Sequence, residues 1–164
     1  MDRQLSGTLP WTRSCFVCGE SNPRGLQLKS RLDDGKVILD YTTRETDLGW
    51  KHAVHGGVLM TLLDEVMTWA AMIASARPCV AAELTVRLVA PAEPDQELRA
   101  ESVVPESGRK VIATDAKVYG PGGAVVAKAT GKYLPMRDDQ FSMSHTDFVW
   151  DADSLQPQDL VRTP

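Results

Sequence analysis

The chain has 164 residues, of which 43% are hydrophobic and 24% are charged. A chain of this length usually folds as one domain, and it can bury about 68–70% of its unfolded surface without a stabilising metal or disulfide. The composition excludes disordered and fibrous proteins. A net charge of −4 argues against general binding of nucleic acid or of anionic membranes, because both need a basic surface.

The three cysteines, Cys15, Cys18 and Cys79, are an odd number, and residues 1–12 show neither the basic nor the apolar segment of a secretory signal. Both features favour a reducing, cytoplasmic location. Cys15 and Cys18 have the spacing that begins many zinc sites, but the sequence contains neither a second such pair nor a paired histidine motif. We therefore predict a buried thiol pair, with no metal and no cofactor.

The chain divides into three parts by its composition. Residues 1–25 contain prolines and glycines without a sustained period, which indicates an irregular arm. Residues 26–135 hold the periodic segments of one domain. Residues 136–164 carry six aspartates, two arginines and scattered aromatic side chains, so this acidic tail is either disordered or laid over a neighbouring surface.

Alternating apolar and polar residues indicate strands on both sides of one helix. Two strands come first, joined by the turn Asp33-Asp34-Gly35, and four more follow the helix, separated by turns rich in glycine and proline. In chain order the expected strands cover residues 26–32, 37–43, 83–90, 97–104, 110–119 and 124–134. The pattern predicts an α+β domain, in which an antiparallel sheet of five to six strands carries the helix across one face.

Apolar residues recur at helical spacing from Gly56 to Ala76, before the stop signal Arg77-Pro78. Asp64 lies nearly opposite this stripe, yet the helix has no lysine or arginine and is apolar nearly all round. The two acids in its middle, Asp64 and Glu65, argue against a membrane span. One sheet covers only one side, so we predict that a second copy of the chain covers the other and partly desolvates Asp64. The residues of the stripe are Leu59, Leu62, Leu63, Val66, Ala70 and Ile73.

His55-Gly56-Gly57 stands at the start of this helix. Free N–H groups at a helix start, reinforced by the helix dipole, can bind an anion or a developing oxyanion. A glycine pair alone is more often a flexible entry to a helix. The combination with His55 and with an acid nine residues later, Asp64, favours a functional site.

The segment from His55 to Glu65, which reads His-Gly-Gly-Val-Leu-Met-Thr-Leu-Leu-Asp-Glu, resembles the helix motif of hotdog-fold acyl-CoA thioesterases of the PaaI type. Residues 83–91 resemble the next strand of that family, and residues 15–26 resemble an N-terminal motif in part of it. The likeness spans about residues 15–134. It implies a hotdog fold and the hydrolysis of acyl-CoA thioesters, and the expected assembly is a homodimer or a tetramer of two dimers.

Carried over position by position, the resemblance assigns Asp64 as general base or nucleophile, and Gly57, with Gly56 beside it, as the donor of N–H groups to the oxyanion. His55 would orient the thioester. Glu65 is the rival acid, and the register of the motif favours Asp64. The helix start and Asp64 are some 10 Å apart along one helix, so we predict that two subunits share each site.

Coenzyme A carries phosphates, so basic side chains should surround the mouth of the site. Arg109 and Lys110 form the densest pair, with Arg87 and Lys132 as alternatives. Trp50 lies in the loop before the helix, where it would either line the acyl pocket or pack on the helix.

Two other functions stay open. One is a non-catalytic hotdog protein that binds acyl-CoA, and the other is a hotdog dehydratase or hydratase in which His52 or His55 acts with an acid. A carboxylate placed near a thioester favours hydrolysis over binding alone. The sequence has no GxSxG nucleophile motif, no P-loop and no dinucleotide-binding fingerprint.

Overall fold

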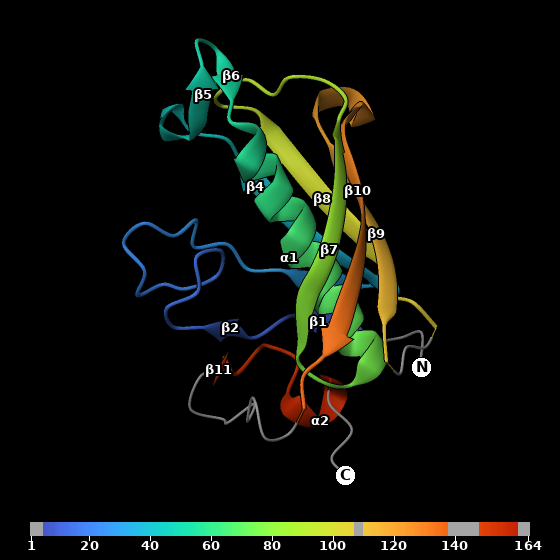
Figure 1. The fold of residues 1–164 in the computed structure, drawn as a ribbon. Coiled ribbons are helices and arrows are strands. Elements are labelled where there is room, and N and C mark those ends of the chain that lie inside the picture. Colours follow the sequence, from blue (N-terminus) through green and yellow to red (C-terminus); the bar gives the residue numbers. More distant parts are fainter. Residues whose placement is uncertain (1–4, 107–109, 138–147, 161–164) are drawn as a thin grey trace.

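The computed structural model describes residues 5–106, 110–137 and 148–160. Within these residues a long helix, α1 (Gly56–Ser75), crosses one face of a curved antiparallel sheet (Figure 1). The sheet has seven strands in the order β1-β3-β4-β8-β9-β10-β7, and this arrangement confirms the predicted α+β architecture. The strands are β1 (Gly7–Thr8), β3 (Arg31–Asp33), β4 (Lys36–Thr42), β7 (Cys79–Leu88), β8 (Glu97–Val103), β9 (Ile112–Tyr119) and β10 (Val125–Pro135).

Smaller elements complete the described chain. The β5–β6 hairpin projects beyond the start of α1 (Figure 1). Strand β11 pairs with β2, so segments from the two ends of the chain lie side by side. The bounds are β2 (Trp11–Thr12), β5 (Leu48–Trp50), β6 (Ala53–Val54), β11 (Phe148–Val149) and α2 (Pro157–Leu160), with short 3-10 helices at Glu45–Asp47 and Pro121–Gly123.

The first expected strand, residues 26–32, is largely irregular, and only its end lies in β3. Gln27 has a φ of +57°, a left-handed conformation that interrupts an extended run. The N–H of Leu26 donates to the carbonyl of Phe16 in the arm at 2.9 Å, so its backbone bonds to the arm rather than to a strand. The sheet nevertheless has seven strands rather than six, because β1 of the arm pairs with β3.

The hairpin between β3 and β4 has the predicted turn. Asp34 and Gly35 have φ values of +45° and +74°, and the tight turns of two-residue hairpins require such positive values. After the helix, β8, β9 and β10 begin and end within two residues of their expected limits. Strand β7 begins four residues early, at Cys79, because its pairing with β10 continues to Pro135.

Helix α1 ends close to its predicted limit. Ala76 caps the helix with a φ of +53°, and Pro78 follows two residues later. Leu62, Leu63 and Val66 of the predicted stripe are fully buried. By length and composition alone α1 could cross a membrane, yet in this domain it forms the centre of the hydrophobic core.

Shortening one of these core side chains should lower stability markedly. We expect Leu62→Ala to reduce the free energy of unfolding by about 2–5 kcal/mol, because the helix and sheet can only partly close the resulting cavity. Val111→Ala is the matched control, since Val111 is 53% exposed. Denaturant-induced unfolding followed by circular dichroism measures both variants, and equal stability of the two would contradict the described core.

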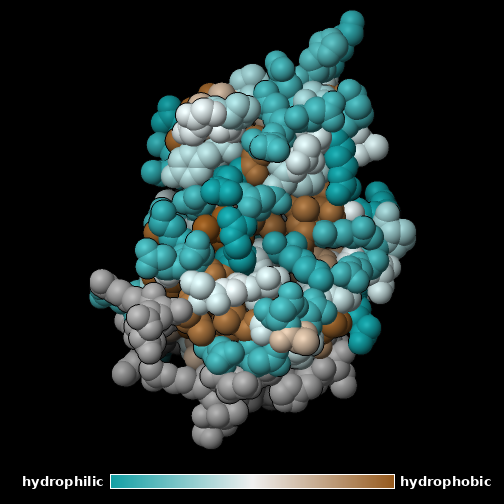
Figure 2. Space-filling model, turned by 180° about the vertical axis from the view of Figure 1, so that it is seen from behind, coloured by the Kyte–Doolittle hydropathy of each residue, from teal (hydrophilic) through white to brown (hydrophobic). Residues whose placement is uncertain are grey.

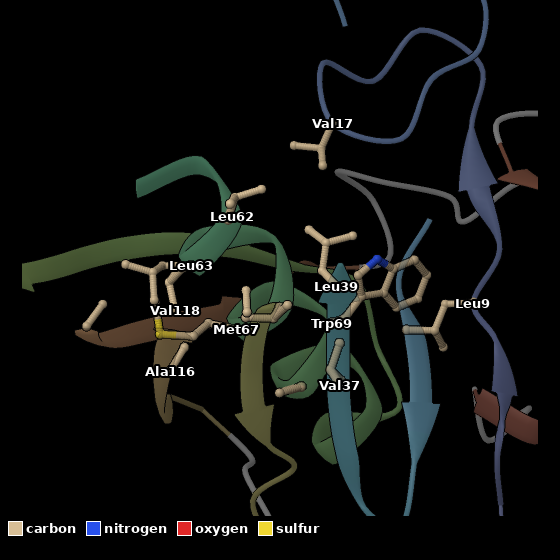
Figure 3. Packing of buried hydrophobic residues seen from close by; sticks show 14 of the residues in the cluster. Leu9, Val17, Val37, Leu39, Leu62, Leu63, Met67, Trp69, Ala116 and Val118 are labelled. Carbon is tan, nitrogen blue, oxygen red and sulfur yellow. The ribbon is translucent and has the colours of Figure 1, made fainter. Parts of the chain in front are cut away.

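The side of α1 that carries Trp69 is covered by segments from the two ends of the chain. Leu9 and Val17 of the arm belong to the same buried cluster as Trp69 of the helix (Figure 3). The ring of Phe148 from β11 meets Trp69 edge-on, with the ring centroids 6.1 Å apart. The chain itself therefore covers the side of α1 that carries Trp69, which the sequence did not predict. That a second copy lies against the face of Asp64 stays a prediction. The arm, which shows no periodicity, folds back over the helix.

Part of the acidic tail also lies on the arm. The indole Nε1 of Trp11 donates to Asp151 at 3.1 Å, and Lys29 Nζ lies 2.9 Å from the same carboxylate. Leu155 is buried, and its N–H donates to the carbonyl of Thr8. The tail was expected to be either disordered or laid over a neighbouring surface. The described residues 148–160 are laid over a surface, which belongs to their own chain.

One edge of the sheet carries an exposed apolar strand. Within the described residues β7 pairs with β10 alone, and its outer edge is open. Val80, Leu84, Leu88 and Val89 are 38–51% exposed along this edge. Seen from behind, the molecule shows mainly hydrophilic side chains with smaller hydrophobic areas between them (Figure 2). An open apolar edge strand is a surface at which another chain can pair.

Candidate active site

A histidine side chain caps the N-terminus of α1. His55 is the N-cap residue, and its Nδ1 accepts a hydrogen bond from the Gly57 N–H at 2.9 Å. The Gly57 N–H is therefore occupied in this structure, whereas a free donor was expected. Because Nδ1 is the acceptor, the imidazole proton is on Nε2. The His55 side chain is exposed, so rotation about χ1 would release the Gly57 N–H to a ligand.

The two glycines allow close approach at the helix start. A Cβ at position 56 would lie 2.7 Å from Cδ1 of Leu88 in β7, far inside the contact distance of two carbon atoms. A Cβ at position 57 would lie 2.9 Å from Nδ1 of His55. The absence of a side chain at Gly56 thus allows the helix to pack against Leu88 of β7. The absence of one at Gly57 leaves room for the capping side chain of His55.

Tyr41 and Asp47 hold the segment that leads to His55. The Tyr41 hydroxyl donates to Asp47 Oδ2, and the carbonyl of Asp47 accepts the His55 N–H at 2.7 Å. Burial and the neighbouring Asp47 carboxylate raise the pKa of Tyr41, which keeps the hydroxyl protonated as a donor. Strand β4 is thereby linked through the following 3-10 helix to the cap of α1.

Asp64 is partly buried on a side of α1 that meets β10. Tyr133 of β10 is fully buried and donates its hydroxyl to Asp64 Oδ1 at 2.8 Å, while the Thr68 hydroxyl lies 3.5 Å from the same oxygen. Burial and the charge of Asp64 raise the pKa of Tyr133, so the hydroxyl keeps its proton. Tyr133 pairs with Ala81 of β7, which places this hydrogen bond one strand from the open edge.

Tyr133 was not among the predicted site residues. The alternation of β10 predicts that its side chain points inward, but not which helix residue it meets. That contact depends on the register of the sheet, since 69 positions separate Tyr133 from Asp64.

Glu65, the rival acid, lies under the other cover of the helix. Its Oε1 accepts a hydrogen bond from Nε1 of Trp69 at 3.1 Å. Burial raises the pKa of Glu65 to about 8, and negative charge on Cys15 of the arm adds to the effect. The two neighbouring acids therefore have different surroundings: Asp64 meets the sheet, and Glu65 meets the arm.

A hollow of about 540 Å³ lies between the arm and the start of α1. Its lining includes His55, Gly57 and Thr61 from the helix start, together with two cations, Arg24 and Arg44. Neither arginine was predicted for the site. Arg24 belongs to the irregular arm, where periodicity carries no information about which surface a side chain faces.

A second hollow, of about 430 Å³, lies on the β7 side of the helix start. Gly56, Leu59 and Leu88 contribute to its lining, and so does Trp50 from the β5–β6 hairpin. Trp50 is 85% exposed. It therefore borders this hollow and does not pack into the core against the helix.

Of the basic residues that were predicted for the mouth of the site, Arg87, Lys110 and Lys132 line neither hollow at the helix start. Lys110 lies two positions before β9, and β9 begins at the end of the sheet opposite the β5–β6 hairpin (Figure 1). Arg87 is exposed on β7, and Lys132 forms an ion pair with Glu83 at 3.0 Å. Arg109 lies outside the described residues.

Comparison with known families places this site in context. Residues 52–127 match the model of the thioesterase superfamily. This segment contains the helix start, Asp64 and the strands from β7 to β9. The match places this segment in the thioesterase superfamily, and the described residues have the hotdog fold. The family and the fold expected from the helix motif are thereby confirmed. No curated protein gave a match to the chain.

Several solved structures share this fold at low sequence identity. The PaaI protein of Escherichia coli is 23% identical, with a TM-score of 0.58 over 64% of this chain and 75% of its own. A Streptococcus mutans protein bound to acetyl-CoA is 20% identical, with a TM-score of 0.58 over 62% of this chain and 82% of its own. An acyl-CoA hydrolase of Staphylococcus aureus, in complex with butyryl-CoA and CoA, is 19% identical, with a TM-score of 0.59 over 64% and 65%. At these identities the likeness concerns the fold.

Proposed function

We propose that this protein hydrolyses acyl-CoA thioesters to a free acid and coenzyme A. The observation that carries the proposal is Asp64, a partly buried carboxylate fixed by Tyr133 on the helix whose first turn contains Gly56 and Gly57. Thioester hydrolysis needs an activated oxygen nucleophile and N–H donors for the oxyanion, and one helix carries both. The superfamily match and the acyl-CoA ligands of similar structures support this substrate class.

The proposed working form is a homodimer, or a tetramer of two dimers, that assembles through the β7 edge. Gly57 and Asp64 are separated by roughly 10 Å along the helix axis, too far for both to act on one carbonyl group. Leu84 and Leu88 leave exposed apolar surface on β7, the strand beside β10, whose Tyr133 holds Asp64. A second chain paired there would bring its helix start toward Asp64, which gives two shared sites per dimer.

In this mechanism the Gly57 N–H changes its acceptor. The thioester oxygen replaces Nδ1 of His55, and the helix dipole stabilises the oxyanion that forms. The released His55 side chain orients the thioester. Asp64 of the other subunit either takes a proton from the attacking water or attacks the carbonyl carbon itself. Single turnover in water labelled with oxygen-18 tests for the nucleophilic role, because label enters the Asp64 carboxylate only if Asp64 forms an acyl anhydride that water opens at its Cγ.

The hollow between the arm and the helix start is proposed to receive the anionic part of the substrate. Arg24 and Arg44 supply positive charge there, in a protein whose net charge is −4. Guanidinium groups bind phosphates through paired N–H donors. Lys110, which was predicted for this role, does not line this hollow.

A hydrolysis screen tests the proposed function. The protein is mixed with short, long, branched and aromatic acyl-CoAs, and release of the CoA thiol is followed with a chromogenic thiol reagent. Turnover of at least one class that is lost in the Asp64→Ala protein supports the proposal. Absence of turnover across the panel, together with tight binding of an acyl-CoA, would instead favour the non-catalytic binding protein.

Tyr133 should act by holding Asp64 in place. We expect Tyr133→Phe to lower kcat by about 10- to 100-fold with little change in KM, because a hydrogen bond to a charged group contributes about 1.5–3 kcal/mol. Tyr119→Phe on the neighbouring strand β9 is the matched control and should keep the parent rate. Steady-state kinetics on the best acyl-CoA measures both, and an unchanged kcat in Tyr133→Phe would remove Tyr133 from the mechanism.

A further inference from the structure

The arm contains a thiol pair that the proposed hydrolysis does not use. Cys15 and Cys18 lie in a tight loop that is closed by a hydrogen bond from the Gly19 N–H to the Cys15 carbonyl at 3.0 Å. A Cβ at position 19 would lie 2.5–2.7 Å from backbone atoms of Cys15 and Arg13, so only glycine fits there. The loop therefore holds the two cysteines in a fixed relation to one another.

The two sulfur atoms have different surroundings. Sγ of Cys15 accepts the N–H groups of Val17 at 3.3 Å and of Cys18 at 3.5 Å. A hydrogen bond from the Cys18 thiol, with further help from these N–H groups, lowers the pKa of Cys15 to about 5 although burial opposes the shift. The same hydrogen bond, together with burial, raises the pKa of Cys18. The surroundings therefore favour a thiolate on Cys15 and a protonated thiol on Cys18.

Exposure divides the pair in the same way. Cys15 is partly exposed, whereas Cys18 is buried beneath the loop. A reagent from solution can reach the Cys15 thiolate first. Thiol–disulfide exchange proceeds through attack by such an accessible thiolate, followed by attack from a neighbouring thiol.

Helix α1 places an acid next to this pair. Glu65 interacts electrostatically with both cysteines, and negative charge on Cys15 contributes to its raised pKa. No group of three or more His, Cys, Asp and Glu side chains that could hold a metal ion is found in the described part of the chain.

We propose that Cys15 and Cys18 form a dithiol site that low-molecular-weight disulfides oxidise to an intramolecular disulfide. The Cys15 thiolate attacks one sulfur of the small disulfide, whose S–S bond breaks and releases one thiolate. Cys18 then loses its proton to the solvent and attacks Sγ of Cys15, and a second small thiolate leaves. The small disulfide is thus reduced by two electrons to two thiols, and the protein dithiol is oxidised to a disulfide.

Mass spectrometry of the intact chain tests this site, with oxidised glutathione as the probe. The parent is the full chain with Cys79→Ser, which leaves Cys15 and Cys18 as its only thiols. We expect the folded parent to lose two hydrogen atoms without retaining glutathione. Adding Cys18→Ser should trap one glutathionyl group on Cys15. Adding Cys15→Ser should slow modification by at least about 10-fold, because the remaining buried thiol is protonated.

Three results would overturn the proposal. The first is a parent chain that keeps both thiols under these conditions. The second is a Cys15→Ser variant that reacts as fast as the Cys18→Ser variant. The third is zinc bound to the parent in proportion to the protein and lost on Cys15→Ser, since the pair would then be a ligand pair. Trapping in the Cys18→Ser protein is a gain of mass, so partial unfolding of another variant does not imitate it. The readout does not involve thioesterase activity, so it stands or falls separately from the proposed hydrolysis.

Discussion

Replacing Asp64 with asparagine should lower kcat for acyl-CoA hydrolysis by about 10²- to 10⁴-fold, the loss that removal of a general base or nucleophile produces. Asparagine keeps the size of the side chain, and its amide oxygen can still accept the hydrogen bond from Tyr133. The fold should therefore persist while the negative oxygen is lost. Thiol release measured at saturating acyl-CoA, beside circular dichroism of the same sample, checks both expectations.

The matched control is Glu65→Gln, which removes a carboxylate one residue further along the same helix. Glu65 accepts from Trp69 beneath the arm and lies away from Tyr133, so its replacement should leave kcat within a few-fold of the parent. Full activity of Asp64→Asn would refute the assignment of Asp64. A large loss in Glu65→Gln with a mild one in Asp64→Asn would move the catalytic role to Glu65.

Mixing two inactive chains should restore activity. Gly57→Pro removes the N–H that is proposed to bind the oxyanion, and Asp64→Ala removes the acid, so each homodimer should be inactive. A mixed dimer contains one site with both defects and one site with none. We expect it to recover about half of the parent activity, because a two-fold dimer has two equivalent shared sites.

Co-expression with two different affinity tags isolates the mixed dimer for this measurement. Parent chain paired with Gly57→Pro serves as the control, because one of its two sites is also intact. A mixed dimer as inactive as its two parents, alongside an active control, would show that each site lies within one chain. Elution of the protein as a monomer in size-exclusion chromatography would contradict assembly through β7.

The helix and most strands could be predicted because their burial is periodic in sequence. The apolar stripe of α1 and the alternation of apolar and polar residues in β8, β9 and β10 indicate directly which side chains face the core. The arm could not be predicted in this way. Val17 is buried because the arm folds back on the domain, where backbone hydrogen bonds such as that from Leu26 to Phe16 hold it. Such hydrogen bonds follow no period in the sequence. The covering of α1 by its own chain was missed for this reason.

The candidate site was predictable in part for a similar reason. His55, the glycine pair and Asp64 stand close together in one motif, so the sequence displays them. Their partners come from distant segments: Tyr133 reaches Asp64 through the register of the sheet, and Arg24 reaches the helix start through the arm. The capping of Gly57 by His55 is a side-chain rotamer, which sequence spacing does not specify.

The pairing of β2 with β11 bears on how the protein is made. Trp11 and its hydrogen-bond partner Asp151 are 140 positions apart, so the ribosome must release nearly the whole chain before they can meet. Contacts of such sequence separation form late in folding, which leaves the outer face of α1 in water during translation. A truncated chain limited to residues 26–135 would keep that face, with Trp69, permanently exposed. The smallest unit that folds without aggregating should therefore be longer than the 52–127 segment that identifies the superfamily.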